Sequence, residues 1–287
     1  MPIRPLKAFP AFFLALALVW VSEVAGGFPA HAQPAPPLKI VATTSLIAEI
    51  AGEIGGTAVE IATLIPPASC PGHFDIKPDD MKLLAVAQVF MLHNWQGRQF
   101  SDEIIRASGN RTLTKAVLAV PGNWMAPPAQ IEATDRIAAV LAEADPPRAF
   151  SYRAAAERRK ATVQRVGAAQ ERRLTDATVG AIAVLANDMQ ADFIRWSGFQ
   201  VAGVFGRGED MSPRDMEDAI RLGRAKAVRL VVDNLQSGKQ AGIGIAKEIG
   251  AVQVTLSNFP GGFKDTGAWA KAIEKNVDLL LAAIGKP

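Results

Sequence analysis

One short loop of this 287-residue chain carries the side chains best suited to bind a metal ion. The segment Pro66–Asp80 (PPASCPGHFDIKPDD) contains Cys70, the only cysteine, and His73, one of three histidines. Proline stiffens the loop, and the Cys-x-x-His spacing presents a soft thiolate near an imidazole. The same spacing also fits a capped turn with a buried thiol and a surface imidazole, so the surrounding elements must decide between the two.

A cysteine nucleophile is the enzymatic alternative for the same residues. Cys70 with His73 or His93 would form a thiolate–imidazole pair. The sequence identifies no third orienting group and no strand-to-helix elbow around Cys70, and it contains no phosphate-binding loop, dinucleotide fingerprint or Gly-x-Ser-x-Gly motif. We therefore expect no enzyme, and a cysteine-dependent hydrolase is the least favoured hypothesis.

Residues 1–32 have the organisation of a cleavable signal peptide. Arg4 and Lys7 form a basic region, Ala11–Val21 is an apolar run, and Ala30–Ala32 (AHA) has the small-x-small pattern of a cleavage site. We expect a mature, periplasmic chain that begins at Gln33. A retained membrane anchor is the alternative, but the apolar run is short for a span of the bilayer.

Composition narrows the possible partners and the source of stability. The formal net charge is only +3 and basic residues alternate with acidic ones, so we expect no nucleic-acid partner. A single cysteine excludes an internal disulfide, so stability must come from a buried core. The mature chain is long enough for one large domain or two smaller ones.

Strand-like and helical segments alternate in the first half of the chain. Such alternation predicts right-handed β-α-β units and a parallel sheet. The expected helices are Leu46–Ile54 and Pro78–Ala87. The expected strands are Lys39–Thr43, Val59–Ile65, Val89–His93 and Ala116–Val120.

The middle of the chain differs, because it is rich in Ala, Arg and Glu from Ile131 to about Thr178. A break at Asp145–Pro147 precedes a long helix, expected over about Arg148–Leu174, which would span about 40 Å. Its apolar positions are mostly alanine, which favours a rigid spine between two lobes over a coiled coil.

The second half returns to the alternating pattern, with Ser212 as the N-cap of a helix that starts at Pro213. The sequence thus predicts an α/β protein of two lobes joined by a spine helix, with boundaries at 33–146, 147–177 and 178–287. The expected strands are Ala181–Ala186, Val201–Phe205, Ala227–Val232 and Val252–Leu256, and the expected helices are Met189–Trp196, Pro213–Gly223, Gly242–Ile249 and Thr266–Ile284.

Several segments together resemble the zinc/manganese family of ABC-transporter solute-binding proteins over essentially the whole mature chain. Leu64–Asp80 is similar to the family's first ligand loop, and Ala87–His93 is similar to its "ADLVFYN" strand. The other matching segments are Lys39–Ser45, Trp124–Pro127 (WMAP), Asp145-Pro146, Ser212–Ala219 and Leu230–Gln236. The resemblance implies two lobes of four-stranded parallel sheet and a metal held between them.

The family's metal ligands do not all carry over to this sequence. The resemblance implies three histidines, or two plus a Glu, and one Asp, contributed by both lobes. His73 stands at the first position, whereas Gly122 and Asn187 stand at the second and third, and Ser257-Asn258 replaces the fourth. Zinc and manganese need imidazole or anionic donors, which these replacements do not supply. Three hypotheses remain.

In the first hypothesis the metal site has moved. Cys70, His73 and His93 would supply a Cys-His-His set, since the family fold places the strand end at His93 beside the same cleft. Met125 and Met189 in cleft loops would add thioethers, which suit copper(I). Each residue also has a structural interpretation: Cys70 and His93 as satisfied core residues and the two methionines as packing.

In the second hypothesis the cleft binds a solute that brings its own charge or its own chelator. Asn187, Ser257, Asn258 and backbone amides would hold it, and Asp233 is expected at a strand end that faces the cleft, unless a basic residue pairs with it. Trp95 and Trp124 would line the cleft or fill a lobe interface. In the third hypothesis the protein has lost binding and serves as an accessory protein of a permease.

Taken together, the sequence predicts a periplasmic solute-binding component of an ABC importer of the metal-cation family. It would act as a monomer and deliver its ligand to an inner-membrane permease. A transition-metal ion, zinc, manganese or copper, is the expected cargo. The long spine predicts a modest hinge closure on the ligand.

Overall fold

The computed structural model describes residues 1–2, 35–96, 102–238 and 240–285. Its compact unit is Pro36–Pro287, and residues 1–35 form a separate unit. The expected signal peptide, apart from Met1 and Pro2, lies outside the described residues. Within the described part, no helix is long and apolar enough to cross a membrane.

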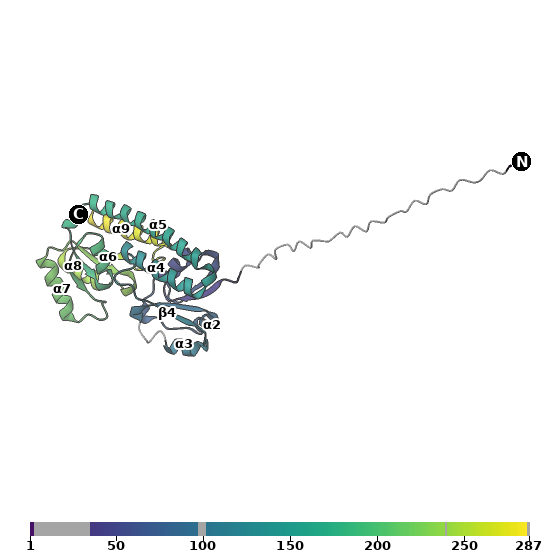
Figure 1. The fold of residues 1–287 in the computed structure, drawn as a ribbon. Coiled ribbons are helices and arrows are strands. Elements are labelled where there is room, and N and C mark those ends of the chain that lie inside the picture. Colours follow the sequence, from purple (N-terminus) through teal and green to yellow (C-terminus); the bar gives the residue numbers. More distant parts are fainter. Residues whose placement is uncertain (3–34, 97–101, 239, 286–287) are drawn as a thin grey trace. The chain divides into compact units, whose positions relative to one another are not determined.

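Two four-stranded parallel sheets organise the compact unit, as predicted (Figure 1). The N-terminal lobe is built on the order β2-β1-β3-β4 and the C-terminal lobe on the order β6-β5-β7-β8. The strands are β1 Leu38–Ala42, β2 Val59–Thr63, β3 Val89–His93, β4 Thr114–Leu118, β5 Ala183–Asn187, β6 Gln200–Phe205, β7 Leu230–Asn234 and β8 Val252–Leu256.

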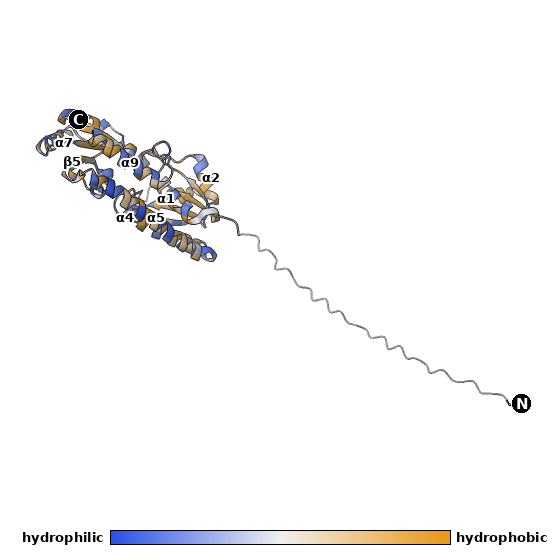
Figure 2. Ribbon diagram, turned by 90° about the horizontal axis from the view of Figure 1, so that it is seen from above, coloured by the Kyte–Doolittle hydropathy of each residue, from blue (hydrophilic) through white to orange (hydrophobic). Residues whose placement is uncertain are grey.

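Helices cover both faces of each sheet, so the central strands are apolar on both sides. Along β3, Val89 and Met91 enter one core cluster while Phe90 and Leu92 enter another. Figure 2 shows hydrophobic strands and helices in which hydrophilic and hydrophobic residues are mixed. The helices are α1 Ser45–Gly55, α2 Pro78–Val86, α3 Asp102–Ser108, α4 Pro127–Ala144, α5 Ala149–Asp176, α6 Ala191–Trp196, α7 Pro213–Ala225, α8 Gln240–Ile249 and α9 Trp269–Ile284.

The expected spine helix is α5, which has 28 residues and extends about 42 Å. It packs against α4, α1 and α9, and Figure 1 shows α5 and α9 running side by side. One core cluster continues from β1 and α1 through these helices to β5 and β8. The two lobes therefore share a core, and the expected boundaries at 33–146, 147–177 and 178–287 stay a prediction.

Several strand ends differ from the prediction by two or three residues. Strand β4 begins at Thr114 and not Ala116, because it is an edge strand whose Thr114, Lys115 and Val117 side chains are exposed. Strand β7 begins late, after Ala227 adopts a left-handed φ of 47°, and it continues to Asn234. That extension places Asp233 inside the strand, which changes its role below.

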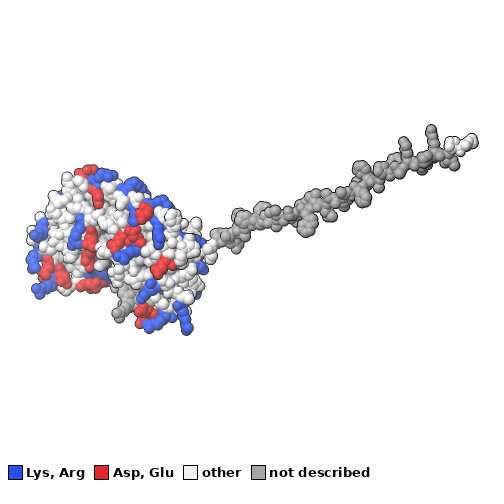
Figure 3. Space-filling view, in the orientation of Figure 1, with Lys and Arg blue, Asp and Glu red and all other residues white. Residues whose placement is uncertain are grey.

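The predicted start of α7 is confirmed. The Ser212 hydroxyl accepts a hydrogen bond from the Asp215 amide at 3.2 Å, and the Asp215 carboxylate accepts one from the Ser212 amide at 2.9 Å. This capping box satisfies two amides that a helix start leaves free. On the face seen in Figure 3, basic and acidic side chains are interspersed over the helices.

A buried ion pair joins the two lobes to the spine. Arg159 on α5 is 4% exposed at its side chain and bonds to Glu49 of α1, while its Nε lies 2.7 Å from Glu53. The other Glu49 oxygen accepts a hydrogen bond from the Trp269 amide of α9 at 2.9 Å. Burial raises the pKa of Glu49, and Arg159 opposes that rise.

We predict that Arg159→Met lowers the free energy of unfolding by about 3–5 kcal/mol, because it leaves the Glu49 carboxylate buried without its cation. Urea unfolding of the purified protein measures the change. Arg136→Met is the matched control, since Arg136 is half exposed and pairs with Glu132 one turn away. This variant should lower the free energy of unfolding by less than about 0.5 kcal/mol. Equal losses in the two variants would contradict the prediction.

Candidate functional site

A cavity of about 470 Å³ lies between the lobes, at the carboxyl ends of both sheets. In open parallel α/β sheets this edge is where ligands bind. The N-terminal lobe contributes Leu46, Pro71, His93, Trp95, Gly122, Asn123 and Trp124, and the C-terminal lobe contributes Asp188, Met189, Asp192, Arg207, Asn234, Gln236, Ser237, Asn258 and Phe259.

His93, at the end of β3, forms part of the N-terminal wall. Its Nε2 lies 2.8 Å from the Thr44 hydroxyl, and its ring stacks on Trp95 with centroids 4.9 Å apart. Trp124 meets the same ring edge-on at 4.3 Å. Burial lowers the pKa of His93 to about 3, so the imidazole is neutral at physiological pH. Its Nδ1 is buried without a hydrogen-bond partner in the described structure.

The loop Pro66–Asp80 contains a 3₁₀ turn over Pro71–His73. Pro71 lines the cavity, whereas the His73 side chain is 62% exposed and its Nε2 lies 3.5 Å from Glu209 of the other lobe. Cys70 is a partly buried free thiol. His73 therefore contacts the opposite lobe at the surface.

Amide side chains connect the loops of the C-terminal wall. Gln190 Nε2 donates to Asn234 at 3.1 Å and to Asn258 at 2.8 Å. Gln236 Oε1 accepts from the Asn258 amide at 3.0 Å. From the other lobe, Asn123 Nδ2 donates to Asn258 Oδ1 at 2.7 Å. Neutral hydrogen-bonding groups thus dominate where the family resemblance implies metal ligands.

The relocated Cys-His-His set is not assembled in this structure. Among the described residues, which include Cys70, His73 and His93, no group of three or more His, Cys, Asp or Glu is placed to hold a metal ion. The physical reason is that His73 faces Glu209 at the surface, while His93 is buried against Thr44 and two tryptophans. The three residues do not converge on one point.

Of the other expected cleft residues, Asn258 lines the cavity, as does Met189, but Met125, Asn187, Ser257 and Asp233 do not. Met125 is fully buried in the core. Asn187 caps a 3₁₀ turn by accepting from the Met189 amide at 3.1 Å. The Ser257 hydroxyl donates to the Phe259 carbonyl at 2.9 Å.

Asp233, which the sequence analysis expects in the cleft, does not line the cavity in this structure, because adjacent residues of β7 point to opposite sides of the sheet. Its carboxylate accepts from the Gly242 amide of α8 at 3.1 Å and from Gln253 at 2.6 Å. A Cβ at Gly242 would collide with this carboxylate. Its neighbour Asn234 lines the cavity instead.

Sequence reasoning missed several residues of the site, among them Arg207, Asn123, Asn234 and Gln236. Each of these residues either ends a strand or follows a strand end by a few residues. This position in the sequence was the feature that could have identified them as cavity residues. Gly122, expected at a former ligand position, does line the cavity. Its φ is +77°, and a Cβ there would lie 3.5 Å from Asp192 Oδ2.

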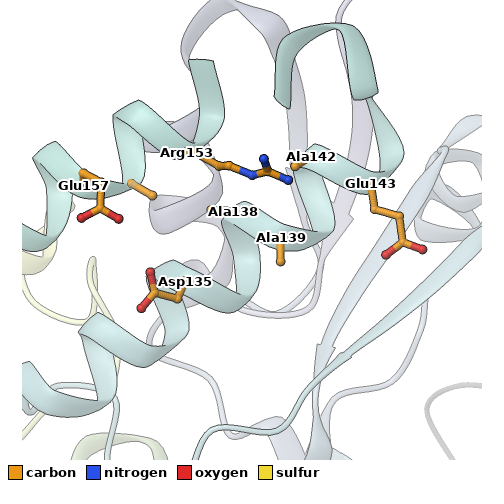
Figure 4. A pocket seen from close by; sticks show the side chains of 8 residues that line it. Asp135, Ala138, Ala139, Ala142, Glu143, Arg153 and Glu157 are labelled. Carbon is orange, nitrogen blue, oxygen red and sulfur yellow. The ribbon is translucent and has the colours of Figure 1, made fainter. Parts of the chain in front are cut away.

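A second cavity of about 280 Å³ lies between α4 and α5 (Figure 4). The cavity is lined by alanines of both helices and by four charged residues, Asp135, Glu143, Arg153 and Glu157. Lys160 neutralises two of these acids, at 2.7 Å from Asp135 and 2.9 Å from Glu157. The pair of Lys160 with Asp135 connects the two helices, and the interlobe cavity is the better candidate site.

Two α/β lobes that share one cavity and a rigid helical connection define the class of solute-binding proteins. Residues 40–283 match the model of the family described as zinc-uptake complex component A, periplasmic, and the chain belongs to this family. This confirms the assignment to the metal-cation solute-binding proteins of ABC transporters.

Individual relatives agree with that family. The manganese-binding lipoprotein MntA of Bacillus subtilis (strain 168) is 26% identical over 213 residues, which cover 68% of this chain and 70% of that protein. A periplasmic metal-binding protein from Candidatus Liberibacter asiaticus has a TM-score of 0.73 at 13% identity and covers 85% of this chain and 98% of its own.

Two further solved structures share the fold. ZnuA has a TM-score of 0.71 at 18% identity and covers 86% of this chain and 99% of its own. The solute-binding protein FpvC of P. aeruginosa in complex with Ni²⁺ has a TM-score of 0.73 at 20% identity, and the match covers 86% of this chain and 97% of FpvC.

The structural role of Asp233 predicts a pH dependence of stability. Burial raises the pKa of Asp233 from 3.8 to about 6, so the folded protein binds this proton more tightly than the unfolded chain does. The protonated Asp233 therefore stabilises the folded protein. This stabilisation is fully present below pH 3.8 and is lost as the pH rises through about 6. We predict that wild type loses about 3 kcal/mol relative to Asp233→Asn between these limits. Urea unfolding at several pH values tests this, and parallel curves for the two proteins would contradict it.

Proposed function

We propose that this protein captures a metal-containing solute in the cavity between its lobes and delivers it to an ABC permease in the inner membrane. The observation that carries the proposal is the placement of the cavity, which is lined by strand-end residues of both lobes. A site shared by two lobes couples ligand binding to their relative position, which a permease can recognise. The metal ions named for the relatives, Mn²⁺ and Ni²⁺, and the family's zinc uptake support a metal cargo.

Binding is a better account of this cavity than catalysis. The described structure directs both imidazole Nε2 atoms to groups other than Cys70, because His73 faces Glu209 and His93 bonds to Thr44. A nucleophilic cysteine needs an adjacent base within hydrogen-bond reach. The amides that line the cavity are suited to hold a solute in place and do not transfer protons at neutral pH.

The leader at residues 1–32 and the family's periplasmic description support secretion to the periplasm, with cleavage before Gln33. We propose that the mature protein works there as a monomer. Several hydrogen bonds cross between the lobes: Ser45 to the Pro260 carbonyl at 2.7 Å, Gln236 to the Pro67 carbonyl at 2.7 Å and Asn123 to the Met189 carbonyl at 2.8 Å. Together with the spine, they support a small closure and not a wide hinge movement.

We predict that protein purified from its own periplasm without chelators carries a transition metal in stoichiometric amount. Native mass spectrometry with elemental analysis measures the bound mass and the metal. Deletion of the gene should also lower the cellular uptake of that metal, and a plasmid copy should restore it. Metal-free protein together with unchanged uptake in the deletion strain would overturn the proposed function.

A further inference from the structure

We propose that the cargo enters the cleft as a metal complex of a planar, anionic organic chelator and not as a bare ion. This inference rests on the proposed function, since it specifies the solute class of the same cavity. Four features of the cavity support it: the size, the donor groups, the exposed aromatic face and the charges.

Size and donors disfavour a bare ion. Zinc is held by a closed set of ligand atoms at about 2.0–2.3 Å, whereas cavities of about 300–1,000 Å³ suit organic molecules. This cavity has about 470 Å³, and no metal-binding group of three acids, histidines or cysteines occurs among the described residues. A chelator would supply both the missing volume and the missing donors.

Trp95 provides a surface for a planar group. One face of its indole stacks on the His93 ring at an interplanar angle of 20°, yet Trp95 remains 54% exposed and lines the cavity. A large aromatic side chain held in place from behind and open in front is suited to stack on a flat ligand. A bare ion is coordinated by nitrogen, oxygen or sulfur atoms and would not bind to the face of an indole.

The wall behind Trp95 has unfilled hydrogen-bonding capacity. His93 is 1% exposed, and its buried Nδ1 has no partner in the described structure. Buried polar atoms are rarely left without a partner, and this atom, like Gln96 Nε2 and Gln190 Oε1, has hydrogen-bonding capacity left for a water or a polar ligand group at the cavity wall. A neutral imidazole can take part without repelling a cation.

The charges of the cavity suit a solute that carries both signs. Arg207 lines the cavity with a side chain 24% exposed, and Glu209, at 3.9 Å, is only a distant partner. A guanidinium in this position favours a carboxylate or phenolate. Asp188 and Asp192 lie on the same lobe and supply negative charge; Asp188 accepts from the Met189 amide and Asp192 bonds to Arg195 at 2.7 Å, so part of each carboxylate's capacity is already used.

Isothermal titration of the apo, full-length mature protein tests the inference. The titrants are Zn²⁺, Mn²⁺ and Fe³⁺, each as its complex with pyridine-2,6-dicarboxylate, 8-hydroxyquinoline-5-sulfonate or 2,3-dihydroxybenzoate. Zn²⁺, Mn²⁺ and each chelator alone are titrated for comparison. We expect at least one complex to bind at least 10-fold more tightly than its chelator alone and, for Zn²⁺ and Mn²⁺, than its metal alone.

Two variants locate the binding. Trp95→Ala and Arg207→Gln should each weaken binding of the complex at least 10-fold. Trp196→Phe and Arg221→Gln are the matched controls, because neither side chain lines the cavity, and they should change the affinity less than 2-fold. Trp95 is exposed, so its truncation leaves the core intact, and urea unfolding verifies this.

The other outcomes overturn the inference in distinguishable ways. Tight binding of Zn²⁺ or Mn²⁺ alone that is lost in His73→Ala and kept in Trp95→Ala would overturn it while supporting the proposed function. A chelator that binds equally well without metal would contradict both the inference and a metal cargo. Binding of no complex in the set, or binding that ignores both variants, would also overturn the inference.

Discussion

The structure depends on the buried contact of Arg159 with Glu49. It joins α1, α5 and, through the Trp269 amide, α9, which are helices packed on different sheets. An uncompensated charge at this point would be costly, so the three helices keep their relative positions. Because this connection and a shared core fix the lobes, the cavity can change shape only through its loops and small rotations. A rigid frame of this kind selects its ligand by fit more than by large closure.

Within that frame the cavity walls follow from how the strands end. Strands β3, β5 and β7 each lead into a 3₁₀ turn that contains a buried glutamine, namely Gln96, Gln190 and Gln236. These amides satisfy neighbouring backbone and side-chain groups, for example the His93 amide at 2.9 Å from Gln96 Oε1. Gln96 Nε2 and Gln190 Oε1 have no partner in the described structure, but the other hydrogen bonds of these glutamines form amide networks that fix the walls. The site is therefore rigid and mostly neutral, whereas a site for bare zinc needs several anionic or imidazole donors.

The sequence predicted the architecture well, because alternating apolar strands and a long alanine-rich helix leave few ways to bury their surfaces. It predicted the site less well. Sequence spacing identified the loop of Pro71 and the strand end at His93, but it could not specify which of two adjacent residues on β7 faces the cavity. A shift of one position exchanges the two sides of a strand, and this made Asp233 the expected residue in place of Asn234. Arg207 lies after β6, and its guanidinium is so close to Gly72 of the other lobe that a Cβ there would come within 2.9 Å of it; sequence spacing does not reveal such an approach.

The backbone conformation of Gly122 disfavours the side chain that the family resemblance implies at this position. The resemblance assigns a histidine to this position, but a φ of +77° is strained for any residue with a Cβ. A Cβ at this position would lie 3.5 Å from Asp192 Oδ2, which is an ordinary contact, so the backbone conformation and not crowding disfavours a histidine here. A histidine ligand is therefore disfavoured at this position, and the exposed tryptophan and the arginine of the cavity are consistent with a ligand larger than an ion.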